Sequence, residues 1–213
     1  MNPSIKFILI LLVSLEITFV LDYRVNLLVA GCALIYLLLS KLSWRRYLLL
    51  IFLPVIPILG AWTSFNTFSS PGIAWVMVTR ILSYIYLGAA FSFTTDMDLW
   101  LDSLEQNFHL PTVFIYGLRG ALSFVPRVKQ EIKTIRVAAL MRGVKIAPYS
   151  PQLFFKSILI SLRWSERLST AMISHGFTEN APRTHFKEVS IKKSDIFIAG
   201  ILILLMQFSL LFF

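Results

Sequence analysis

The sequence predicts an all-α membrane protein with about five transmembrane helices and a cytoplasmic coupling domain of about three amphipathic helices before the last span. Three observations predict this fold. Of the 213 residues, 57% are hydrophobic and only 15% are charged, whereas soluble domains average about a quarter charged residues. Five apolar stretches approach the length that a helix needs to cross a bilayer of ~30 Å. Most of the charge gathers in one segment, residues 94–193.

The apolar stretches divide the chain into three parts. Residues 1–93 are expected to form a membrane domain with four spans, and residues 194–213 the last span, after a cytoplasmic domain at 94–193. The third stretch contains Pro54 and Pro57, which predict a kink or a break because proline cannot donate a helical hydrogen bond. The five expected spans are residues 5–21, 25–39, 47–62, 73–93 and 194–213.

The charged residues predict the orientation in the membrane. Lys41, Arg45 and Arg46 lie between the second and third stretches, whereas residues 63–72 carry no charge. Of the 20 Lys and Arg residues, 14 fall within 94–193. Because cytoplasmic loops are enriched in Lys and Arg, these regions are expected inside the cell, with the amino terminus inside and the carboxyl terminus outside. Topology thus explains the basic clusters, and the apolar spans make nucleic acid a poor fit as a partner.

The cytoplasmic segment begins with one predicted helix and an ambiguous stretch. Thr95 is a plausible N-cap of a helix that starts near Asp96, because short polar side chains cap the first turn. Pro111 ends that helix. Residues 112–125 are apolar but too few for a span, so they are expected to lie at the interface or to dip into the bilayer.

Two basic amphipathic helices then end on glycines. The first is expected to start after Pro126 and to end with Arg142 and Gly143; the second covers residues 151–175 and is followed by Gly176. Such helices often lie flat on anionic lipid, and an Arg-Gly end is often only a cap. The repeated ending favours a second interpretation, because an arginine past a helix end reaches a carboxylate in a partner groove. We interpret the chain as a coupling protein, not a catalyst.

Patterns of known catalytic and metal sites are absent from the sequence. It has no phosphate-binding G-x-x-x-x-G-K-[ST] loop, no H-E-x-x-H pattern, no paired cysteines and no G-x-S-x-G turn. Within the predicted spans, the charged residues away from the span ends are Glu16 and Arg80. Because such residues are costly in lipid, we expect them to pair with each other or to line a contact with a second membrane subunit.

Short motifs along most of the chain resemble a known family, the transmembrane T component of energy-coupling factor (ECF) transporters. Residues 2–6 (NPSIK) resemble the family's D-P-R-x-K opening, with Asn2 in place of the acid. Residues 94–99 (TTDMDL) and 109–111 (HLP) resemble the entry to its coupling region. Residues 140–143 (LMRG) and 174–177 (SHGF) fall where the family carries two A-R-G motifs.

The resemblance implies the scaffold of an ATP-driven vitamin or metal-ion importer in a bacterial or archaeal cell membrane. Such a subunit joins two cytoplasmic ABC ATPases to a small membrane substrate-binding S component, and its own chain binds no cofactor because the ATPases bind ATP. The second motif has His175 in place of arginine, so Arg142 is expected to be the main anchor. The ATPase-coupling residues that the resemblance implies are Met141, Arg142, Gly143, Ser174, His175 and Gly176.

Two alternatives stay open from the sequence. The chain could be the transmembrane subunit of another ABC-type importer, which would have a substrate pathway within its own spans. It could also be a membrane enzyme with an unrecognised site, in which case substitution of Glu16 or Arg80 should abolish its activity. The S component would determine the substrate, so this chain does not identify it.

Overall fold

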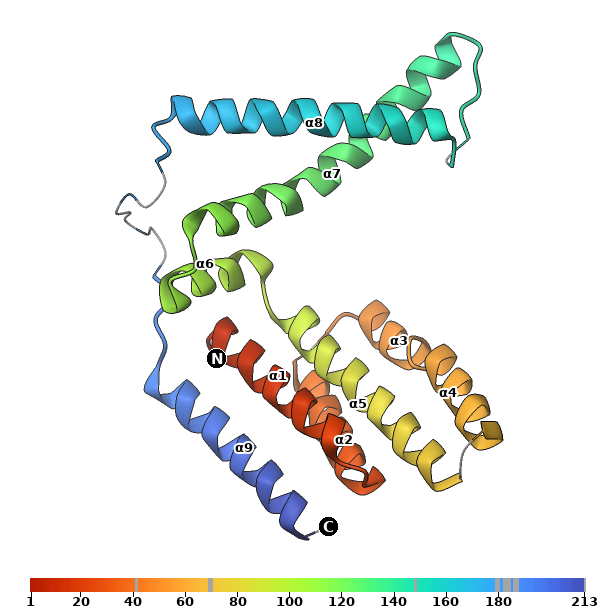
Figure 1. Cartoon of the computed structure of the whole chain (residues 1–213), viewed down its shortest axis with the longest axis vertical. Helices are drawn as coiled ribbons and strands as arrows, with labels where there is room; N and C mark the ends of the chain where they lie inside the picture. Colours follow the sequence, from red (N-terminus) through yellow and green to blue (C-terminus); the bar gives the residue numbers. More distant parts are fainter. Residues whose placement is uncertain are drawn as a thin grey trace. The chain divides into compact units, whose positions relative to one another are not determined.

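The computed structural model describes residues 1–40, 42–68, 71–147, 149–178, 181, 185 and 188–212. Within these residues the regular structure is α-helical (Figure 1), which confirms the all-α prediction. Lys41, Pro148 and Phe213, on which parts of the predicted loops and last span fall, lie outside the described residues. The helices are α1 (Pro3–Phe19), α2 (Tyr23–Leu39), α3 (Trp44–Phe52), α4 (Val55–Phe68), α5 (Pro71–Thr94), α6 (Met97–Phe108), α7 (Thr112–Met141), α8 (Pro151–Ser174) and α9 (Lys193–Phe212).

The chain divides into two compact units. The first unit consists of Met1–Ser103 and Val189–Phe213, and the second of Leu104–Glu188. The chain therefore leaves the first unit once, after Ser103, and returns to it once, at Val189.

Helix α5 lies at the centre of the first unit. It packs against α1, α2, α3 and α4, while α9 packs against α1 (Figure 1). Ile17 of α1 and Leu37 of α2 are among the most deeply buried apolar side chains. Because lipid tails are as apolar as these side chains, close packing and not removal from water holds such helices side by side in a membrane.

Three helical segments of the described chain are long and apolar enough to cross a membrane. They are Trp44–Thr67, Gly72–Thr94 and Lys193–Leu210. Tyr23–Leu39 is apolar but shorter. The chain is therefore an all-helical membrane protein with three candidate spans, and the predicted five spans exceed this number.

The predicted break in the third apolar stretch is confirmed. Helix α3 ends at Phe52 and α4 begins at Val55. Leu53 still donates its N–H to Leu49 at 2.9 Å, but Pro54 has no N–H to continue the series. The helical bonds resume when Ile58 donates to the Pro54 carbonyl at 3.0 Å.

Asp96, and not the predicted Thr95, caps helix α6. The backbone N–H of Asp98 donates to Oδ1 of Asp96 at 3.1 Å, which satisfies one of the free donors of the first turn. Thr95 is still bonded to the end of α5, because its N–H donates to the Phe91 carbonyl at 3.0 Å. The helix start is thus one residue later than predicted.

Helix α7 is continuous through Pro126, which corrects the prediction of a helix start there. Its 30 residues include both the apolar stretch 112–125 and the basic stretch after it. A proline inside a helix removes one hydrogen bond, but its fixed φ is helical, so the turns on both sides can continue the helix. Residues 112–125 are therefore the first half of α7 and form no separate surface segment.

Candidate functional site

The carboxyl end of α7 closes in the cap predicted at Gly143. The N–H of Gly143, whose φ is 74°, donates to the Leu140 carbonyl at 3.0 Å. The N–H of Val144 donates to the Ala139 carbonyl at 3.0 Å. This pair of bonds is the Schellman pattern, in which a left-handed residue ends a helix and satisfies its last carbonyls. Arg142 is the C-cap residue, so its cation lies at the negative end of the helix dipole.

The end of α8 repeats the same geometry. Gly176 has a φ of 77°, and its N–H donates to the Ile173 carbonyl at 3.0 Å. The N–H of Phe177 donates to the Met172 carbonyl at 2.9 Å. His175 is the C-cap residue here, in the place that Arg142 occupies on α7. The sequence repeat is therefore also a repeat of backbone structure.

Replacing the capping glycine of α8 should loosen the end of this helix. In Gly176→Ala, the Cβ meets the strain of a left-handed φ, which costs about 1–2 kcal/mol. Gly117→Ala is the matched control, because Gly117 lies inside α7 with open space around its Cα, and alanine is favoured there by about 0.5–1 kcal/mol. We expect faster amide hydrogen exchange at 171–177 in Gly176→Ala alone. Equal protection in both variants would contradict this role of the cap.

The two capped ends lie at opposite ends of a crossed helix pair. Helices α7 and α8 cross in Figure 1, and a Cβ on Gly120 would lie 3.2 Å from Cδ2 of Leu168. Tyr116, in the second turn of α7, packs edge-on against Phe177 at the end of α8, with ring centroids 5.7 Å apart. Because α8 has 24 residues, its length of about 36 Å separates its capped end from its start near the α7 cap.

The side chains of both endings are accessible. The exposed fraction of Met141 is 86%, and the other five predicted coupling residues are also exposed: Arg142, Gly143, Ser174, His175 and Gly176. The structure therefore presents two separate surfaces, one at each end of the pair, and does not bring the six residues together in a single site.

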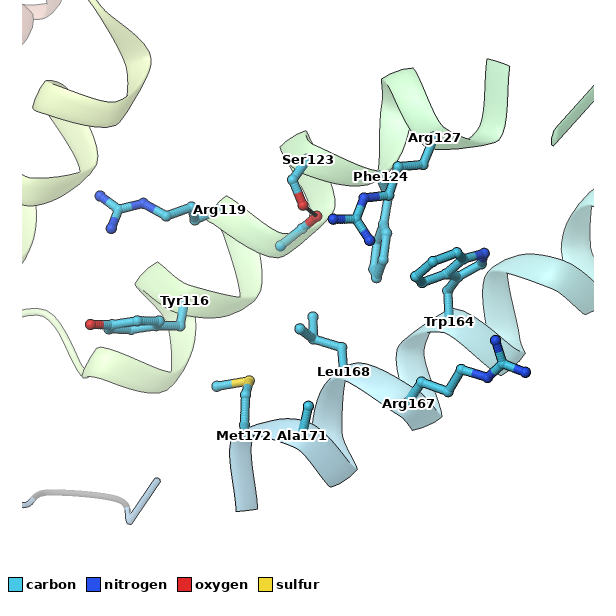
Figure 2. A pocket seen from close by; sticks show the side chains of 11 residues that line it. Tyr116, Arg119, Ser123, Phe124, Arg127, Trp164, Arg167, Leu168, Ala171 and Met172 are labelled. Atoms are coloured by element: carbon cyan, nitrogen blue, oxygen red, sulfur yellow. Dashed lines mark hydrogen bonds between the residues drawn. The ribbon is translucent and has the colours of Figure 1, made fainter. Parts of the chain in front are cut away.

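A groove of about 490 Å³ lies between α7 and α8 (Figure 2). Its floor includes Phe124, Leu168 and Met172. The guanidinium of Arg127 stacks over the Trp164 ring at 4.9 Å from its centroid, a cation–π contact that ties the two helices. The arginines of this groove do not converge on one point in Figure 2, so the groove has no focused anion site.

The apolar side of α8 is exposed. Phe154, Phe155 and Leu162 expose 71%, 61% and 56% of their surfaces. Helix α7 crosses α8 and does not run along it, so only a short part of α8 is covered (Figure 1). Exposed apolar patches of this kind are typical of protein or membrane contacts.

The comparison with protein families decides the identity. The family model described as CbiQ, Cobalt transport protein, matches residues 1–186. The chain belongs to this family. It is the family of ECF T components, which confirms the resemblance read from the short motifs. No curated protein matches the chain. As a member of the CbiQ family, the chain is a membrane component of a transporter.

The predicted ion pair between Glu16 and Arg80 does not form. Glu16 Oε1 instead accepts a hydrogen bond from Nε2 of Gln207 at 2.7 Å, which links α1 to α9. Nη2 of Arg80 donates to the Val20 carbonyl at 2.6 Å, and Val20 is the C-cap residue of α1. Arg80 therefore caps the negative end of α1. The two charged side chains therefore have separate partners. Glu16 links the side of α1 to α9, whereas Arg80 binds the carboxyl end of α1.

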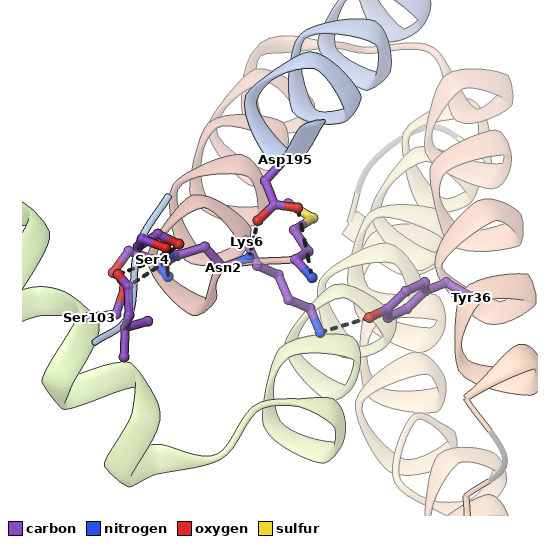
Figure 3. Close-up of polar contacts among 9 residues, drawn as sticks. Asn2, Ser4, Lys6, Tyr36, Ser103 and Asp195 are labelled. Carbon is purple, nitrogen blue, oxygen red and sulfur yellow. Dashed lines mark hydrogen bonds and ion pairs between the residues drawn. The ribbon is translucent and has the colours of Figure 1, made fainter. Parts of the chain in front are cut away.

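A buried polar junction at the start of α1 was missed as a site, although Asn2 and Ser4 belong to the opening motif. Asn2 caps α1, because its Oδ1 accepts from the Ser4 N–H at 3.0 Å. Ser4 and Ser103 share a hydrogen bond of 2.6 Å between their hydroxyls. Asp195 of α9 accepts the backbone N–H of Asn2 at 2.8 Å (Figure 3). Each of these four residues is less than one-tenth exposed.

Lys6 extends this junction to α2 and α5. Its ammonium donates to the Tyr36 hydroxyl at 3.1 Å and to Oγ1 of Thr94, and it lies 4.8 Å from the centre of the Tyr36 ring. Lys6 is buried, so these contacts replace part of its hydration. The motifs that begin at Asn2 and Thr94 therefore contact each other in the fold. In the sequence, these two motifs were the available signal for the junction.

Proposed function

We propose that this chain is the T component of an ECF importer and couples two cytoplasmic ABC ATPases to a membrane S component. The observation that carries the proposal is the pair of exposed, identically capped helix ends on α7 and α8. Because the ends of α7 and α8 are separate and have the same cap geometry, they could each bind one of two related partners. Family membership supports the same role, because CbiQ proteins work with ATPase and substrate-binding components.

The proposed placement puts α1, α2, the α3–α4 pair, α5 and α9 across the membrane, with residues 94–193 inside the cell. The distribution of Lys and Arg supports this orientation. Residues 104–178 carry ten Lys and Arg against three Asp and Glu. A positive charge of this size would attract the acidic surface of a partner or the anionic cytoplasmic leaflet.

The two ATPase contacts are proposed to differ in strength. Arg142 is always charged and can form a bidentate contact with a carboxylate. His175 takes the same C-cap position on α8, but an imidazole ring lacks the planar fork of donors with which a guanidinium binds a carboxylate. Unequal anchors would suit two non-identical ATPases, with Arg142 at the stronger contact.

Reconstituted uptake tests the coupling role. The chain would be assembled with its ATPases and S component in liposomes, with radioactive Co²⁺ as the first probe because the family is described as a cobalt transport family. We expect uptake that requires ATP and all the subunits. Uptake of a vitamin in place of Co²⁺ would keep the coupling role and change the substrate class. Uptake without the S component would contradict the proposal and favour an importer with its own substrate pathway.

A further inference from the structure

The carboxamide of Asn2 contacts both places where the chain passes between its two units. Ser103 is the last residue before the chain leaves the first unit, and its hydroxyl donates to Oδ1 of Asn2 at 2.7 Å. Val189 is the first residue after the return. Nδ2 of Asn2 donates to the carbonyls of Val189 and Ser190 at 3.4 and 3.3 Å. One side chain thus bridges the exit and the return (Figure 3).

Asn2 is itself fixed on every side. Its exposed fraction is 5%, and its Oδ1 also accepts the Ser4 N–H that caps α1. Both donors and the acceptor of the carboxamide are therefore in use. Its backbone N–H is held by Asp195 in the first turn of α9. Buried, fully satisfied networks of this kind are stiff, because each broken bond leaves an unpaired polar group.

We infer that Asn2 is a positioning residue, which fixes both crossings to the tip of α1 so that movement of the second unit is transmitted to the membrane helices. This inference rests on the proposed coupling function. Without the bridge, a displacement of Leu104–Glu188 would bend the backbone near Ser103 and Val189. With it, the same displacement moves α1 directly and α9 through Asp195. A rigid connection of this kind conserves the movement that the ATPases produce.

The choice of amide at position 2 offers a selective test. In Asn2→Ser, the side chain keeps an oxygen that can cap α1, because serine caps helices about as well as asparagine does. The variant loses the two Nδ2 bonds to Val189 and Ser190, so the bridge to the return segment is removed while α1 stays capped.

Spin labelling of the assembled complex measures the consequence. Trp44→Cys and Tyr149→Cys would carry nitroxides in the first and second units, in a Cys32→Ser background, because both sites are highly exposed (77% and 97%). We expect ATP to shift a narrow distribution of label distances in the otherwise native complex. In Asn2→Ser the distribution should broaden and the shift should be lost, while ATP hydrolysis stays within about twofold, since no ATPase contact is altered.

Asn26→Ser is the matched control. Asn26 is another fully buried asparagine of the first unit, and its Nδ2 donates to the Val76 carbonyl at 3.3 Å, away from both crossings. This variant should lose stability but keep the ATP-dependent shift. The inference is overturned if Asn2→Ser keeps the native width and shift, or if Asn26→Ser loses them equally. If the native complex itself shows neither an ATP-dependent shift nor ATP-driven uptake, the proposed function fails together with the inference.

Discussion

Arg142→Glu is expected to separate the chain from one of its ATPases. The substitution puts a carboxylate at the exposed C-cap of α7, where the helix dipole disfavours an anion. It also sets like charges against each other if the partner groove presents a carboxylate. Loss of a hydrogen-bonded charge pair at an interface costs about 2–5 kcal/mol, which weakens binding by roughly 30-fold to several thousand-fold.

The measurement is the affinity of each purified ATPase for the detergent-solubilised chain. Arg136→Glu is the control, since it makes the same charge change on an exposed residue of α7 before its capped end. Arg142→Lys should fall between the two, because lysine keeps the charge and loses the bidentate geometry. His175→Glu should weaken binding less than Arg142→Glu. Binding of Arg142→Glu within about threefold of the native chain would mean that the α7 end is no docking site.

Trp100→Ala is expected to release helix α6 from helices α1 and α5. The Trp100 ring packs against Phe7 of α1 and Phe91 of α5, with centroid distances of 5.2 and 5.5 Å. These two rings also contact each other at 5.5 Å. Truncation of a packed tryptophan costs about 3–5 kcal/mol, so the α6 amides should exchange roughly a hundredfold to several thousandfold faster.

A second tryptophan gives the comparison for this result. Trp44 is 77% exposed at the start of α3, so Trp44→Ala removes the same side chain with little loss of contact. Hydrogen exchange at 97–108 should therefore stay native in Trp44→Ala and rise in Trp100→Ala. Unchanged exchange in both variants would show that the aromatic cluster does not hold α6.

Local signals in the sequence predicted the helix ends well. Pro54 predicted the break between α3 and α4, because a missing N–H acts within its own helix. Gly143 and Gly176 predicted the two caps, because a left-handed φ strongly favours glycine. Pro126 misled the prediction because proline is favoured in a first turn and also tolerated inside a long helix, and sequence alone does not separate the two cases.

Long-range contacts were not accessible to the same reasoning. Asn2 and Asp195 are 193 positions apart, and no periodic pattern in the sequence indicates that they contact each other. Glu16 and Arg80 were paired by charge alone, but the backbone of Val20 and the amide of Gln207 are closer partners. Hydrogen-bond partners of this kind carry no charge signal in the sequence. The coupling roles of Arg142 and His175 stay predictions, because their partner is another protein.

The most direct measurement of the coupling role is affinity purification of this chain from its native cell in a gentle detergent, with partners identified by mass spectrometry. We expect recovery of two ABC ATPases and a small hydrophobic membrane protein. That small protein would also identify the substrate class. Recovery of the chain alone, under conditions that keep other membrane complexes intact, would contradict the coupling role.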